Sequence, residues 1–317
     1  MFLIKIVPTK TNIQFIRWRK AAMSISAALV LLSAVLAFAP GLNFGIDFRG
    51  GILIEVQTKG PADQRAMRAN LGGLGLGEVS LQEFGADDTV LIRIEKQSGD
   101  ATAQQKAVAK VRAALGDDLD YRRTEFVGPK VSGELIEAGA IAIALSVVLM
   151  LIYIWFRFEW HFGVGAVVAL IHDVALSVGM FAITQMEFNL STIAALLTIV
   201  GYSINDTVVV YDRVRENLRK FKSMNLADVL NLSINDTLSR TAMTSVTTLL
   251  ALGALFIFGG AVIQGFVFAM IWGVVVGTYS SIFIAAPLLI VLGLGERHRS
   301  GEDKDKGKDQ GKAQTST

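Results

Sequence analysis

The sequence contains no cysteine, only three histidines and five prolines, and only 18% charged residues. Without cysteine the chain has no disulfide, no thiol chemistry and no thiolate-bound metal. His161, His172 and His298 are far apart in the chain, so we expect no shared metal site. The charged share is well below the roughly 25% of soluble domains, whereas 52% of the residues are hydrophobic. These proportions indicate a polytopic membrane protein.

A phosphate-binding loop is also missing, because no stretch reads G-x-x-x-x-G-K-[ST]. ATP is therefore not expected to be an energy source within this chain. The glycine-rich run at 72–75 is interpreted as a loop and not as a nucleotide cradle. We expect no cofactor, no metal, no catalytic residue and no nucleic-acid partner.

Six apolar runs are long enough to cross a bilayer as helices. They are predicted at 21–40, 138–156, 162–186, 188–211, 241–258 and 262–292. A signal peptide is the alternative for the first run, but the run is long and lacks a small-residue cleavage pattern after it. Pro287 is expected to kink or end the sixth span. Gly273 and Gly277 form a GxxxG pair, which is a weak signal for close helix packing.

Basic residues predict the orientation of the spans. They gather in the leader, 1–20, in the segment 212–240 and at the start of the tail, 295–317. With six spans all three segments fall on one side, which the positive-inside rule makes cytoplasmic. Within 212–240 we predict an amphipathic helix at 226–238, with Asn225 as its N-cap. The polar tail is expected to be disordered.

The polar segment 41–133 is predicted to be a domain on the opposite, periplasmic side of the membrane. Its pattern indicates strands at 51–58, 78–84, 89–95 and 119–127 and helices at 61–71 and 100–115. The order β-α-β-β-α-β predicts an α+β, ferredoxin-like domain with two helices on one face. We expect its first and last strands to lie in the centre of the sheet. No catalytic cluster stands out, so a binding or coupling role is expected.

Polar residues inside the spans mark candidate functional positions, because an ionisable group there costs about 2.5–3.5 kcal/mol. Asn205 and Asp206 interrupt the fourth span, and Arg240 opens the fifth. Asp206 and Arg240 could meet across a helix interface. Alternatively, Asp206 is wetted near the surface and Arg240 snorkels to the headgroups. His172 and Asp173 in the third span could relay protons or could serve helix packing alone.

Several long motifs carry a resemblance to a known family. They are FGIDFRGG (44–51), VGPKVSGEL (127–135), ALIHDV (169–174), GYSINDTVVVYDRVREN (201–217), RTAMTSVTT (240–248) and FGGAVIQGFVFAMIWGVVVGTYSSIFIAAPL (258–288). In these motifs, from Phe44 to Pro287, the chain resembles the SecD/SecF family of bacterial protein-export membrane proteins, and within it the SecF subunits.

The resemblance implies a six-helix protein of the bacterial inner membrane, with both termini cytoplasmic and one periplasmic domain. It implies a SecD-like partner related by pseudosymmetry, as in RND-type exporters, and association with the SecYEG translocon. The implied activity is non-enzymatic: proton motive force promotes translocation and periplasmic release of preproteins. The implied proton-coupling residues are Asp206 and Arg240, with Asn205, His172 and Asp173 as further candidates. The family motif residues are Gly45, Asp47, Phe48, Gly50, Gly51, Gly201 and Arg213.

Two other functions are compatible with the same pattern. An RND-like exporter of small molecules would use a similar membrane region, but the single domain at 41–133 is small for that role. A scaffold that only steadies the translocon would use the polar groups for packing.

Overall fold

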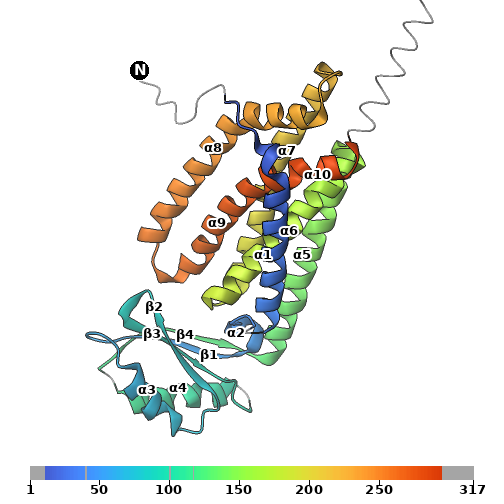
Figure 1. Cartoon of the computed structure of the whole chain (residues 1–317). Coiled ribbons are helices and arrows are strands. Elements are labelled where there is room, and N and C mark those ends of the chain that lie inside the picture. Colours follow the sequence, from blue (N-terminus) through green and yellow to red (C-terminus); the bar gives the residue numbers. More distant parts are fainter. Residues whose placement is uncertain (1–10, 40, 100, 117, 295–317) are drawn as a thin grey trace, which may run out of the picture.

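The structure is a computed structural model that describes residues 11–39, 41–99, 101–116 and 118–294. It consists of a helical bundle with a small sheet domain at one end (Figure 1). Residues 1–10 of the expected leader and the whole expected tail, 295–317, lie outside the described residues.

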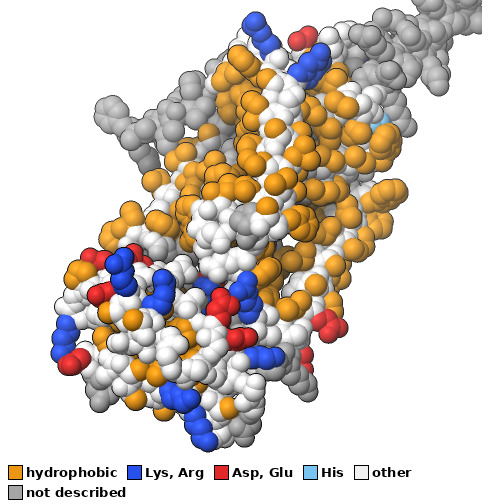
Figure 2. Space-filling model, turned by 60° about the horizontal axis from the view of Figure 1, so that its bottom comes forward, with side chains coloured by type: hydrophobic (Ala, Val, Ile, Leu, Met, Phe, Trp, Pro, Cys, Tyr) orange, Lys and Arg blue, Asp and Glu red, His pale blue; other side chains and the backbone are white. Residues whose placement is uncertain are grey.

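Six helices are long and apolar enough to cross a membrane, which confirms the predicted number of spans. Side chains such as Phe38, Trp155 and Phe156 are exposed on them. Hydrophobic side chains cover the bundle in Figure 2, whereas Lys, Arg, Asp and Glu gather on the sheet domain. The helices are α1 (Arg19–Phe38, after a 3-10 turn at Phe15–Trp18), α5 (Pro129–Arg157), α6 (Trp160–Thr184), α7 (Leu190–Lys220), α8 (Leu226–Phe258) and α9 (Ala261–Ser280).

The basic segment expected at 212–240 is mostly a continuation of two membrane helices. α7 extends to Lys220, and α8 begins at Leu226 and runs without a break into the fifth span. Asn225 caps α8 as predicted, accepting a hydrogen bond from the backbone of Ala227. The polar side chains of this part of α8 have partners, because Asn231 and Asn235 accept hydrogen bonds from the backbone of Ile16 and Ile13.

The sixth span changes helix type before Pro287. α9 ends at Ser280, a π-helical turn η2 spans Ser281–Ala285, and the short helix α10 follows (Ala286–Val291). Proline cannot donate a backbone hydrogen bond, and here it lies in the first turn of α10. Gly273 confirms the close packing of the GxxxG pair, because a Cβ on it would lie 2.2 Å from Ile199 Cγ1.

The sheet domain, residues 51–127, has the ferredoxin-like order β2-β3-β1-β4, and all neighbours are antiparallel. The expectation that the first and last strands are central is therefore right for β1 but wrong for β4, which lies at an edge while β3 takes the second central place. Burial agrees with this order: five of the nine residues of β3 are buried, whereas no residue of β4 is buried. The strands are β1 (Gly51–Gln57), β2 (Val79–Phe84), β3 (Ala86–Ile94) and β4 (Asp120–Val127).

Helices α3 (Gln64–Gly72) and α4 (Ala101–Leu115) cover one face of this sheet, as predicted. The predicted helix at 61–71 begins later, because Asp63 is its N-cap. On the other face Leu53 and Leu91 pack with Ile46 of the short helix α2 (Ile46–Arg49). This second face lies toward the bundle in Figure 1.

Candidate functional site

Asp206 lies on α7 inside the bundle and is only 5% exposed. Its carboxylate accepts a hydrogen bond of 3.0 Å from Thr241 Oγ1 of α8 and one of 3.4 Å from Ser281 Oγ of the π-helical turn. A carboxylate in hydrocarbon is costly unless it is protonated, paired or hydrogen-bonded. Two neutral hydroxyls give it only part of the stabilisation that it had in water, so this position suits a group that can exchange a proton.

Arg240 does not form an ion pair with Asp206 among the described residues, so of the two alternatives for Arg240 this structure does not contain the contact with Asp206. Thr241 faces Asp206 instead, and Arg240, about 100° away around the helix, is exposed. Thr244 and Thr247 are exposed too and share that face with Arg240. Arg240 therefore belongs to an outer face of the bundle in this structure.

Asn205 and Gly201 lie on an exposed face of α7, turned away from the network around Asp206. They are four residues apart and so share one helix face. Thr198 and Ala194 continue the same exposed row. Small and polar side chains in a membrane helix normally meet another helix, and in this chain the row has no neighbour within the described bundle that buries it.

A second buried carboxylate, Asp173 on α6, is fully enclosed at 0% exposure. It bonds three groups: His172 Nδ1 at 2.8 Å, Ser203 Oγ of α7 at 2.5 Å and Ser280 Oγ of α9 at 2.7 Å. His172 is 4% exposed, and its Nε2 has no hydrogen-bond partner among the described residues. The structure thus brings His172 and Asp173 together, joined to two further helices.

The hydroxyl groups of this network were missed by the sequence reasoning. Thr241, Ser203, Ser280 and Ser281 hold the two carboxylates, yet serine and threonine within helices commonly bond only to their own backbone. One signal was available: Thr278 to Ser281 are four consecutive hydroxyl residues in an otherwise apolar span, directly after Gly277.

The segment 43–51, which ends in Gly50-Gly51, joins the sheet domain to the loop between α6 and α7. Asp47 Oδ2 accepts a hydrogen bond of 2.9 Å from the backbone N–H of Leu190, the first residue of α7. The backbone of Gly45 donates to Phe188 O at 2.9 Å, and the Phe48 ring lies 6.0 Å from that of Phe188. Three of the predicted motif residues therefore contact the start of the helix that carries Asp206.

Two glycines finish this segment. Gly50 and Gly51 have φ values of 71° and 126°, which side chains rarely adopt, and a Cβ on Gly51 would lie 2.5 Å from Ile94 O. Beside them Arg93 of β3 pairs with Glu187 of the α6–α7 loop at 2.7 Å, with both side chains mostly buried. The contact thus combines backbone bonds, a cap and an ion pair.

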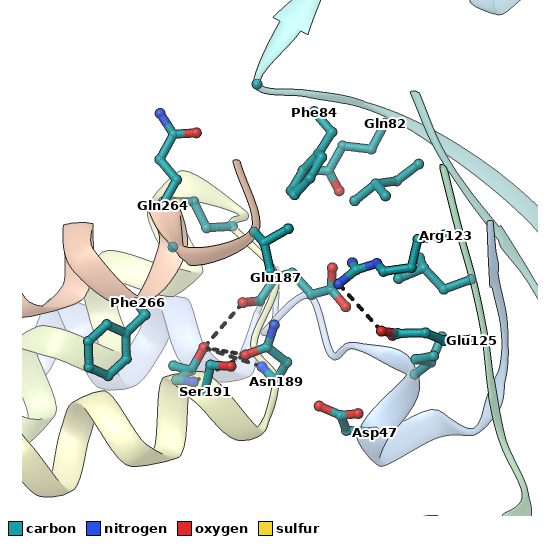
Figure 3. A pocket seen from close by; sticks show the side chains of 18 of the residues that line it. Asp47, Gln82, Phe84, Arg123, Glu125, Glu187, Asn189, Ser191, Gln264 and Phe266 are labelled. Carbon is teal, nitrogen blue, oxygen red and sulfur yellow. Dashed lines mark hydrogen bonds and ion pairs between the residues drawn. The ribbon is translucent and has the colours of Figure 1, made fainter. Parts of the chain in front are cut away.

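A cavity of about 340 Å³ lies between the sheet and this end of the bundle. Figure 3 shows Arg123 and Glu125 of β4 facing it from one side, Glu187 and Asn189 from the loop, and Gln264 and Phe266 from α9. Asp47 and Glu187, which make two of the contacts described above, also line this cavity, so the cavity adjoins the direct bonds between the sheet domain and the bundle.

At the far end of the bundle Arg213 pairs with Glu216 at 2.7 Å and with Asp236 of α8 at 3.1 Å. This motif residue therefore ties the ends of α7 and α8 together. Among the described residues no cluster of three or more His, Asp or Glu could hold a metal ion.

Comparison with known proteins identifies the family. The family model "Protein export membrane protein SecD/SecF, C-terminal" matches residues 107–295, and the model "SecD/SecF GG Motif" matches residues 35–62. A protein translocase subunit SecF from Rhodobacter capsulatus is 48% identical over 96% of this chain and 96% of its own length. The chain belongs to the SecF family of protein translocase subunits. Another family member, from Rickettsia felis, is 47% identical over 91% of this chain and 94% of its own.

Solved structures of SecDF are similar in fold. The crystal structure of SecDF from Thermus thermophilus, a translocon-associated membrane protein, matches with a TM-score of 0.81 and 35% identity over 92% of this chain. A SecDF structure in a super-membrane-facing form matches with a TM-score of 0.63 and 32% identity over 96% of this chain. The chain spans about 40% of the length of these SecDF chains.

Proposed function

We propose that this translocase subunit works with a SecD-like subunit beside the SecYEG translocon and uses the proton motive force to promote preprotein translocation. In this proposal the sheet domain is periplasmic, both termini are cytoplasmic and the membrane is the bacterial inner membrane. The basic residues near the far end of the bundle, Arg213, Arg215 and Arg219, support that orientation through the positive-inside rule.

The observation that carries the proposal is Asp206, a buried carboxylate in a membrane span that is held by hydroxyls and lacks an ion pair among the described residues. Moving one proton charge across 100 mV releases about 2.3 kcal/mol. This is similar to the cost of placing a charged group within a span, so protonation supplies enough free energy to change helix packing there. Arg240 would contribute a positive charge on the outer face beside this site.

The exposed row on α7 that includes Thr198, Gly201 and Asn205 supports a partner within the membrane. Such a row is typical of a helix–helix contact within the membrane. The similar SecDF structures contain further chain beyond the part that matches this protein, since the match covers about 40% of their length. A SecD-like subunit packed on this row would place Asn205 inside the assembled bundle.

The link from the membrane to the sheet domain would run through the GG-motif segment. Asp47 bonds to the first residue of α7, and Asp206 lies further along the same helix. A displacement of α7 on protonation would therefore reach the sheet domain through a hydrogen bond and the Phe48–Phe188 ring contact.

The test is export per inserted molecule in vesicles that contain the chain and its SecD-like partner, with and without a proton gradient. We expect Asp206→Asn to abolish the response to the gradient while the protein still inserts. Asp212→Asn, on the same helix but 41% exposed, is the matched control and should keep the response. If Asp206→Asn responds like the wild type, the protein is a scaffold and its carboxylate serves packing. Export of small molecules, with no effect on preproteins, would favour the RND-like alternative.

A further inference from the structure

Two neighbouring serines of the sixth span bind two different carboxylates. Ser280 Oγ lies 2.7 Å from Asp173 Oδ2, and Ser281 Oγ lies 3.4 Å from Asp206 Oδ2. The carboxylates belong to separate helices, α6 and α7. All four side chains are 5% exposed or less. One peptide unit of the sixth span therefore touches both buried acids of the bundle.

Each serine also has a second acceptor within its own helix. Ser280 Oγ lies 3.1 Å from Gly277 O, and Ser281 Oγ lies 3.0 Å from Thr278 O. A hydroxyl has a single hydrogen, so it can donate fully to only one acceptor at a time. Ser280 is closer to its carboxylate than to its carbonyl, whereas Ser281 is closer to its carbonyl. The two serines are therefore in different bonding states in the same structure.

The backbone at this point is adapted for such a change. A π-helical turn begins at Ser281, and π-helical turns are rare and frequently lie at functional sites. The hydroxyl of Tyr211, from α7, donates to Ala285 O at the end of the turn, at 3.0 Å. Gly277 lets α7 approach, because a Cβ on it would lie 3.1 Å from Ser203 Cβ. The turn is thus fixed to α7 at its end, whereas Ser281, its first residue, and Ser280, the residue just before it, can each donate to either of two acceptors.

We propose that the Ser280–Ser281 pair makes the proton occupancies of Asp173 and Asp206 interdependent, so that one of the two acids holds a proton at a time. An ionised carboxylate is the stronger acceptor for a hydroxyl. When Asp206 takes a proton from water, Ser281 turns to Thr278 O, and the small rotation of the turn brings Ser280 toward the ionised Asp173. When Asp206 releases the proton to water, the rotation reverses. Both serines keep their own hydrogens throughout.

Other titratable groups near the pair belong to each of the neighbouring helices. They are His172 on α6, Tyr202 and Tyr211 on α7, Arg240 on α8 and Tyr279 on α9. Among the described residues only His172 and the two acids are bonded directly to one another or to the serine pair. This proposal rests on the proposed function, which gives the coupling between the two acids its purpose. Its test, however, needs neither the SecD-like partner nor a proton gradient.

The test is an infrared titration of the full chain in lipid nanodiscs, following the C=O band of protonated carboxyl groups. Asp206→Asn and Asp173→Asn assign the bands. In the otherwise wild-type chain, we expect Asp173→Asn to move the midpoint of the Asp206 band by about one pH unit, as for coupled sites. In a chain that also carries Ser280→Ala and Ser281→Ala, Asp173→Asn should move the midpoint of the Asp206 band by less than half as much.

Each serine substitution alone should also break the link, so the test does not depend on the double variant folding. Ser177→Ala is the matched control: Ser177 is fully buried near Asp173, but its hydroxyl donates to the backbone carbonyl of that residue. It should leave the coupling unchanged. The proposal would be overturned if Asp173→Asn moved the Asp206 midpoint equally in the presence and absence of the two serines. Direct charge repulsion between the two acids would then explain the coupling. The two proposals can fail separately. If the infrared titration shows the coupling of Asp173 and Asp206 but the wild-type chain gives no gradient-driven export, only the proposed function is contradicted.

Discussion

Asp47 and Leu190 lie 143 positions apart in the chain, yet the Asp47 carboxylate accepts a 2.9 Å hydrogen bond from the Leu190 backbone N–H. A negative charge at the first turn of a helix is stabilised by the helix dipole and by the free N–H groups there. Asp47, in the short helix α2, therefore stabilises the start of α7, the helix that carries Asp206. This contact gives the GG motif a physical role in joining the sheet domain to the membrane bundle.

Asp47→Ala should lower the stability of the purified chain by about 1 kcal/mol, because a charge at a helix N-terminus is lost. Thermal unfolding in detergent measures this. Asp63→Ala is the control, since Asp63 caps α3 inside the sheet domain through Ala66 N at 3.0 Å. Both variants should lose similar stability, but only Asp47→Ala should weaken gradient-driven export. Equal export by the two variants would mean that the Asp47 contact is structural alone.

The ion pair between Arg93 and Glu187 should contribute more than a surface pair. The two side chains are 15% and 18% exposed, whereas the Lys59–Asp118 pair is 82% and 94% exposed. Exposed pairs are worth about 0–1 kcal/mol, and less at high salt. In double-mutant cycles with alanine, we expect a coupling energy for Arg93–Glu187 that persists at high salt and one near zero for Lys59–Asp118. Similar values for the two pairs would contradict a firm junction between sheet and bundle.

The fold was largely predictable because its signals are local. Six apolar runs and a β-α-β-β-α-β order are read directly from residue periodicity. The position of β4 at an edge of the sheet could not be predicted, because strand order depends on contacts between distant segments. The extension of α8 was missed for a similar reason: the helix predicted at 226–238 is stabilised by distant contacts, because Asn231 and Asn235 bond to the chain that precedes α1.

The candidate site was predicted only in part. Helical spacing puts Arg240, Thr244 and Thr247 on one face, but it cannot give the rotation of α8 relative to α7. The structure turns Thr241 toward Asp206 and leaves Arg240 exposed. The roles of Ser280 and Ser281 depend on the π-helical turn, and no residue pattern in the sixth span predicted that turn.

Gly273 should be intolerant of even a methyl group. An added Cβ would lie 2.2 Å from Ile199 Cγ1, so α9 and α7 would have to move apart. Overpacking of this kind costs about 1–3 kcal/mol. Gly253→Ala on α8 is the control, because no atom of the part of the chain that the structure describes lies within 4 Å of its added Cβ. Thermal unfolding and the amount of inserted protein should fall for Gly273→Ala and stay level or rise for Gly253→Ala. The reverse order would disprove the close packing of α7 and α9.

The last prediction separates the two possible supports of Asp206. Thr241 Oγ1 donates to its carboxylate at 3.0 Å, whereas Arg240 is exposed. Thr241→Val keeps the shape of the side chain but removes the donor, and leaving a buried polar group with one donor fewer costs about 1–3 kcal/mol. Thr244→Val is the matched control, since among the described residues the Thr244 hydroxyl bonds only to carbonyls of its own helix.

Arg240→Gln completes this comparison. Because Arg240 has no ion pair with Asp206 among the described residues, its loss should change the unfolding free energy by about 0.5 kcal/mol or less, as for other surface substitutions. We expect the order of stability Arg240→Gln, Thr244→Val, then Thr241→Val as the least stable, in thermal unfolding of the purified chain. A loss for Arg240→Gln as large as for Thr241→Val would show that Arg240 and Asp206 do pair in the dominant state. In that case the hydroxyl network would describe a minor state of the site.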